Sequence, residues 1–106
     1  MDAWARDLAE SQSLFDAGRF FEAHERLEDA WRREAGARKL YAQGLTQVCA
    51  AFHKLGQKGR ASEGVFELLD KGRAKIAPSN AALALQIEQA SRAIRDGRTP
   101  PPLRWG

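Results

Sequence analysis

The segment from Leu40 to His53 contains no charged side chain, although 29% of the whole chain is Asp, Glu, Lys or Arg. The segment is too short to cross a bilayer, and Gln43, Thr46 and Gln47 would be costly there. A helix that needs no charged face is one that other helices cover on several sides. We therefore predict a central, buried helix over residues 38–55.

The rest of the chain shows helical rather than alternating periodicity, and Gly or Pro falls where helices should stop. Gly18 is expected to end the first helix in the left-handed conformation. The prediction is an all-α fold, a compact single-domain bundle of about five helices over 1–98. The four other helices are predicted at 3–17, 19–34, 60–76 and 80–96. A Pro-rich tail over 99–106 cannot be helical through its prolines, and Trp105 is expected to pin it onto the bundle.

Composition indicates the cellular compartment in which the protein is expected. Cys49 is the only cysteine of the 106 residues, which excludes an intramolecular disulfide and fits a reducing compartment, so a cytoplasmic location is expected. Cys49 itself is predicted to be a buried, inert thiol on the apolar side of the central helix. There is no run of 18 apolar residues and no basic-then-apolar leader, so no membrane span or secretion is expected.

Charge is distributed unevenly along the chain. Residues 1–30 hold three basic and eight acidic side chains, whereas 31–106 hold fourteen basic and six acidic ones. This asymmetry allows a weak nucleic-acid binder as a third hypothesis. The basic side chains concerned are Lys54, Lys58, Arg60, Lys71, Arg73 and Lys75. Aromatic residues do not interleave with them as single-strand binding requires, so this hypothesis ranks last.

The predicted helix 19–34 carries an unusual pair of polar residues. His24 and Glu28 fall inside the apolar stripe that should face the core. A buried carboxylate needs a partner, which we expect to be His24 at i, i+4 or a group on the central helix. The two histidines, His24 and His53, are expected to be neighbours. The candidate polar cluster is His24, Glu25, Glu28, Gln43, Gln47 and His53, with Phe20, Phe21 and Trp31 packed around it.

Three uses of this cluster remain open. It could hold a divalent metal through His24, Glu28 and His53, or Glu28 could orient His24 as an acid–base catalyst. It could instead be a polar network that fixes helix register. A cluster sealed beneath Trp31 and Phe21 would count against an enzyme, because no substrate could reach it. We expect a binding or scaffold module, with a metal-assisted or acid–base enzyme as the alternative.

Partners are not identified by these patterns. A protein partner or a second copy of the chain is the expectation. An exposed Trp4 or Trp105 would mark a dimer surface.

Two family resemblances follow from the residues between 14 and 31. The stretch from Gly18 to Ala30 resembles the second helix of a tetratricopeptide repeat, which implies helix pairs packed in a tetratricopeptide-like manner. The string Glu-Ala-His-Glu-x-Leu-Glu-x-x-Trp over 22–31, with Leu14-Phe-Asp-Ala-Gly18 before it, resembles the bacterial and archaeal helical family known as domain of unknown function 309. The central helix continues this second likeness through Gln43-Gly-Leu, Gln47, Ala50-Ala51 and His53.

The second resemblance implies a small orthogonal bundle and no particular activity. It singles out the positions of the candidate polar cluster together with Trp31. Those positions are His24, Glu25, Glu28, Trp31, Gln43, Gln47 and His53.

Overall fold

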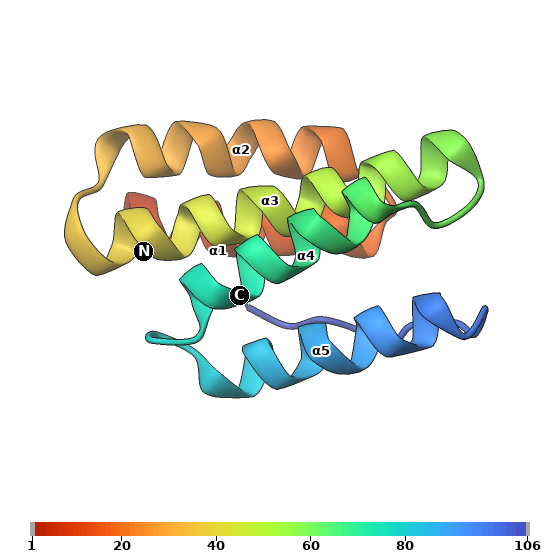
Figure 1. Ribbon diagram of the computed structural model, residues 1–106. Coiled ribbons are helices and arrows are strands. Elements are labelled where there is room, and N and C mark those ends of the chain that lie inside the picture. Colours follow the sequence, from red (N-terminus) through yellow and green to blue (C-terminus); the bar gives the residue numbers. More distant parts are fainter. Residues whose placement is uncertain (1, 106) are drawn as a thin grey trace.

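The uncharged segment forms the longest helix that the structure describes. In the computed structural model, residues 2–105 are described, and within them α3 runs Gly36–Lys58. The other helices are α1 (Ala3–Asp16), α2 (Phe20–Arg33), α4 (Glu63–Ile76) and α5 (Ala81–Arg95), and residues 2–105 contain no strand. The predicted all-α fold of five helices is confirmed (Figure 1). The Cα radius of gyration of 12.7 Å is that of a compact chain of this length.

Glycines end the first and third helices. Gly18 has a φ of +78°, its N–H donates to the Phe15 carbonyl (3.0 Å), and the N–H of Arg19 donates to the Leu14 carbonyl (2.9 Å). The prediction for Gly18 is thus confirmed. The predicted end of α3 at about Leu55 was three residues too early, because the helix continues to Lys58 and is capped by Gly59. That last turn is exposed, so it needs no apolar side chain to remain helical.

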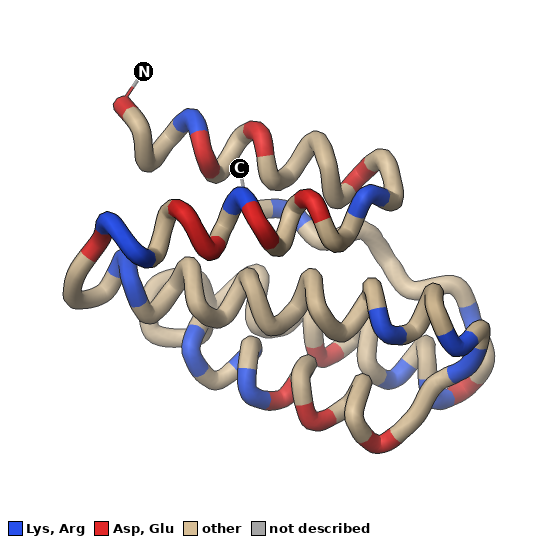
Figure 2. The backbone as a smooth tube through the Cα atoms, turned by 90° about the horizontal axis from the view of Figure 1, so that it is seen from above, with Lys and Arg blue, Asp and Glu red and all other residues tan. Residues whose placement is uncertain are grey.

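The central position predicted for α3 is confirmed. Each helix packs against the next along the chain, so that α3 lies between α2 and α4. Figure 2 shows that the middle of α3 carries no charged residue, whereas the neighbouring α2 is charged along its length. Its buried residues point in several directions and include Tyr41, Ala42, Gly44, Leu45, Thr46, Val48, Cys49, Ala51 and Phe52. No helix among residues 2–105 is long and apolar enough to cross a membrane.

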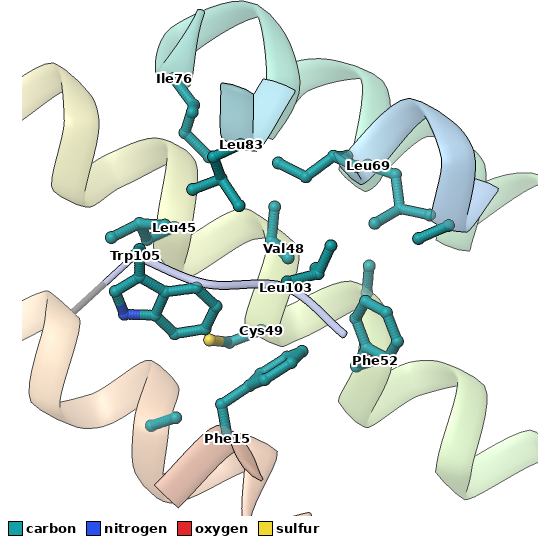
Figure 3. Close-up of a cluster of buried hydrophobic side chains, with 14 of the residues drawn as sticks. Phe15, Leu45, Val48, Cys49, Phe52, Leu69, Ile76, Leu83, Leu103 and Trp105 are labelled. Atoms are coloured by element: carbon teal, nitrogen blue, oxygen red, sulfur yellow. The ribbon is translucent and has the colours of Figure 1, made fainter. Parts of the chain in front are cut away.

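The C-terminal tail is extended, and its Leu103 and Trp105 side chains are buried in the core. The expectation that Trp105 holds the tail against the bundle is confirmed. The Trp105 ring packs edge-on against Phe15 (4.9 Å between centroids), and its Nε1–H donates to Ser11 Oγ (3.0 Å). Gln12 of α1 donates through Nε2 to the Leu103 carbonyl (2.9 Å) and accepts the Trp105 backbone N–H through Oε1 (2.6 Å). Figure 3 shows Leu103 and Trp105 beside Cys49 and Phe15. Trp105 is buried, so it does not form the exposed dimer surface considered from the sequence.

A buried carboxylate joins α1 to the end of α2. Asp7 is 1% exposed and forms an ion pair with Arg33, while its Oδ1 accepts no hydrogen bond within the described chain. The hydrogen bond that Arg33 donates to Asp7 raises the pKa of the guanidinium. Asp7, Ser11, Gln12 and Thr46 are therefore the polar residues that the core holds, in place of the pair predicted on α2.

Candidate functional site

The residues predicted as a polar cluster lie along a row between α2 and α3. At one end Phe21 contacts His53 (5.4 Å between ring centroids), and at the other end Trp31 and Gln43 line one pocket. Because residue 21 is opposite 53 and residue 31 is opposite 43, the two helices run antiparallel along the row. We call this row the α2–α3 seam. Its members are Phe21, His24, Glu28, Trp31, Gln43, Gln47 and His53.

His24 and Glu28 form the expected pair, but at the surface of the seam. His24 Nε2 lies 3.2 Å from Glu28 Oε1, and Arg32 donates to Glu28 Oε2 (3.0 Å). The side chains of His24 and Glu28 are 24% and 29% exposed, so the prediction that they face the core was wrong. The buried face of α2 is instead made by Ala23, Leu27 and Ala30, and the pair lies at its edge.

Phe21 connects the two histidines. Its ring stacks on the His24 imidazole (6.0 Å between centroids, 10° between planes) and tilts against His53. Phe21 itself is 52% exposed, so a half-exposed phenyl ring contacts both imidazoles. The seam thus begins with an accessible aromatic surface. Phe20, predicted to pack around the cluster, instead packs against Phe15 and Phe52 in the core.

The geometry gives little support to catalysis by His24. Its Nε2 faces Glu28, and its Nδ1 is buried with no hydrogen-bond partner among the described residues. A general acid or base needs a nitrogen within hydrogen-bond reach of the substrate proton. Neither nitrogen of His24 offers one in this arrangement.

The geometry also gives no support to a metal at His24, Glu28 and His53. Residues 2–105 contain no group of three His, Cys, Asp or Glu side chains that could hold a metal ion. Glu25, the further candidate, is exposed and makes no ion pair or hydrogen bond with the rest of the described chain. Each histidine ring instead contacts the Phe21 ring.

The other end of the seam opens into a pocket of about 240 Å³. Its lining comes from three helices and consists of Trp31, Gln43, Thr46, Gln47 and Lys75. Lys75 of α4 donates through Nζ to Gln47 Oε1 (2.8 Å), while the Thr46 hydroxyl donates to the Ala42 carbonyl in its own helix (2.8 Å). Lys75 was not predicted as a member of this site, because its position on α4 carries no signal linking it to α2 and α3.

The remaining basic side chains lie in different surroundings. Arg73 shares a small pocket with Asp70 and Glu88, on the side of α4 that faces α5. The Lys54 ammonium lies over Gly64. Of the six basic residues considered for nucleic-acid binding, Lys54, Arg73 and Lys75 therefore lie in three different surroundings, and Arg73 lies beside acids.

The central thiol takes no part in the seam. Cys49 is fully buried, and burial raises the pKa of its thiol. Its prediction as a buried, inert residue agrees with this environment.

A family model described as domain of unknown function (DUF309) matches residues 8–65. The chain belongs to the DUF309 family. The DUF309 match runs from α1 through α3 into the start of α4, so it includes every member of the α2–α3 seam but neither Lys75 nor the tail. No curated protein and no solved structure matches the chain.

Proposed function

We propose that this DUF309 chain is a binding module for a polypeptide and that the α2–α3 seam is its contact surface. The observation that carries the proposal is the seam itself, an accessible row that starts at the exposed ring of Phe21 and ends in the pocket beside Trp31. Aromatic residues that combine a large apolar area with little conformational freedom dominate the energetics of many protein interfaces.

The length of the seam suits a short peptide. Trp31 lies ten positions after Phe21 on α2, which corresponds to about 15 Å along the helix. About five residues of extended peptide span that distance. At the Trp31 end, Gln43 offers an amide that forms no hydrogen bond with the described residues and is free to bond a peptide backbone.

Binding is favoured over catalysis by the state of the polar groups. The His24 and Glu28 side chains already pair with each other, and no described side chain forms a nucleophile–base pair in the seam. The same groups can still recognise a partner, because charged and aromatic side chains at the rim of an interface confer specificity without any reaction.

The experiment is a selection of random 12-residue peptides on the wild-type chain, followed by affinity measurements on two matched variants. Phe21→Gln removes the ring at the seam, and Leu85→Gln removes an equally exposed side chain on α5, since the two are 52% and 54% exposed. Circular dichroism establishes that both variants are folded. We expect selected peptides to bind Leu85→Gln as they bind the wild type and to bind Phe21→Gln about tenfold more weakly or worse.

Two results would contradict the proposal. One is a selection that enriches no peptide over the starting library. The other is a set of peptides whose affinity is unchanged by Phe21→Gln or is lost with Leu85→Gln, which would locate binding elsewhere.

A further inference from the structure

The pocket at the Trp31 end of the seam contains several hydrogen-bond donors, which come from Gln43, Gln47 and Lys75. Gln47 accepts from Lys75 through its Oε1, so its remaining free group is the Nε2 amide, a donor. The ammonium of Lys75 has two further N–H groups beyond the one that it gives to Gln47. Gln43 also presents an amide that makes no hydrogen bond with the described residues.

No acidic side chain lines this pocket within the described part of the chain. On α2 shortly before Trp31, the Glu28 carboxylate pairs with His24 and Arg32, and the Asp29 carboxylate pairs with Arg32. Lys75 forms no ion pair with any acid among residues 2–105, and Lys39 lies over the Trp31 ring (5.8 Å from Nζ to the centroid) without an acidic partner in the same range. The positive charge here is therefore uncompensated.

These features select the charge and shape of a ligand. An anion at Lys75 gains charge-assisted hydrogen bonds, which are about twice as strong as neutral ones. Among the described residues that line the pocket, Lys75 is the one cation. One ammonium with neutral amides beside it matches a single negative charge, whereas a phosphate dianion calls for more cations around its oxygens. The indole of Trp31 adds an apolar wall for the carbon that bears the group.

We propose that the pocket formed by Trp31, Gln43, Gln47 and Lys75 binds a carboxylate. The proposal deepens the function proposed above, because a carboxylate at the end of a peptide-binding seam anchors the peptide and sets its direction. The carboxylate can belong to a small free carboxylic acid or to a bound peptide.

The test uses the full chain labelled with ¹⁵N and titrated with sodium acetate at constant ionic strength. Acetamide, which has the same shape without the charge, and inorganic phosphate are titrated in parallel. The side-chain amide signals of Gln43 and Gln47 and the indole signal of Trp31 report the pocket directly. We expect saturable shifts with acetate in the millimolar range and none with acetamide.

Two variants assign the effect to the pocket. Lys75→Met keeps an unbranched side chain of similar length against α3 and removes the charge, whereas Lys71→Met makes the same change one turn earlier at an exposed position of α4. Backbone amide spectra establish that both are folded. We expect Lys75→Met to weaken acetate binding by about tenfold or more and Lys71→Met to leave it unchanged.

The carboxylate proposal is overturned if the acetate shifts do not saturate, if acetamide reproduces them, if Lys75→Met binds acetate like the wild type, or if phosphate binds more tightly than acetate. These outcomes do not affect the peptide selection. Failure of the carboxylate proposal can therefore be distinguished from failure of the proposal that the seam binds peptides. For a peptide that binds the seam, tighter binding of the free acid than of its C-terminal amide assigns the carboxylate to the peptide end. Loss of affinity on changing an Asp or Glu of the peptide to its amide assigns it to that side chain.

Discussion

Gly44 of α3 and Gly72 of α4 meet without room for a side chain on either helix. A Cβ on Gly44 would lie 2.8 Å from the Gly72 carbonyl oxygen, and a Cβ on Gly72 would lie 2.7 Å from the Gly44 carbonyl oxygen. The Cβ of Lys75 lies 3.1 Å from the same position on Gly44. The close crossing therefore brings α4 near enough to α3 for the Lys75 ammonium to reach Gln47 and complete the pocket.

The first prediction concerns this crossing. Gly44→Ala is expected to lower the free energy of unfolding by about 1–3 kcal/mol, because the methyl group would overlap backbone and force the helices apart. Urea denaturation measures the change. Gly56→Ala is the control in the same helix, since a Cβ there meets nothing within 4 Å. It is expected to stabilise by up to about 1 kcal/mol through helix propensity, and equal effects at the two sites would contradict the account.

The second prediction concerns the tail. Gln12→Ala is expected to cost about 2–4 kcal/mol, because it leaves the carbonyl of Leu103 and the N–H of Trp105 without their partner in a buried site. Thermal and urea unfolding measure it. Gln89→Ala, at an exposed position on α5, should change stability by no more than about 0.5 kcal/mol. A Gln12→Ala variant as stable as Gln89→Ala would show that the tail does not hold α1 in place.

The third prediction concerns the seam. His24→Ala is expected to cost less than about 1 kcal/mol, because the pair with Glu28 lies at the surface and Glu28 keeps its hydrogen bond from Arg32. Urea denaturation at neutral pH measures this change. A loss above about 3 kcal/mol is typical of breaking a buried ion pair. Such a loss would mean that the pair of His24 and Glu28 belongs to the structural core.

The fourth prediction concerns pH. Burial raises the pKa of Cys49 in the folded chain, whereas the unfolded thiol ionises near its ordinary pKa of about 8.5. Above that pH the unfolded state binds fewer protons than the folded state, so the free energy of unfolding should fall by about 1.4 kcal/mol per pH unit. Below that pH Cys49 contributes no slope. Urea denaturation between about pH 7.5 and 10 should show this slope in the wild type and its loss in Cys49→Ala, and the same slope in both would assign it to another group.

Much of the fold could be predicted from the sequence, because the signals are local. The uncharged segment after Leu40 identified the central helix, and Gly18 identified the end of α1. The pairing of His24 with Glu28 follows from their spacing of one helical turn. Each of these relations lies within one helix or at its end.

The relations that the sequence left open join elements far apart in the chain. The prediction that His24 and Glu28 face the core was wrong because the periodicity of α2 does not reveal how much of its apolar face α3 covers. Asp7 was missed because its partner, Arg33, lies on another helix, and Lys75 was missed for the same reason. Such contacts depend on the relative positions of helices, which periodicity within one helix does not specify.

The binding surface itself is located by the chemical-shift footprint of a selected peptide on the ¹⁵N-labelled chain. We predict that the largest shift changes fall on Phe21, His24 and His53 and on the side-chain amides of Gln43 and Gln47. Residues around Leu85 should remain unperturbed. A footprint centred on α5, or on the separate pocket that Trp4, Tyr41 and Asn80 help to line, would contradict the assignment of the α2–α3 seam as the binding surface.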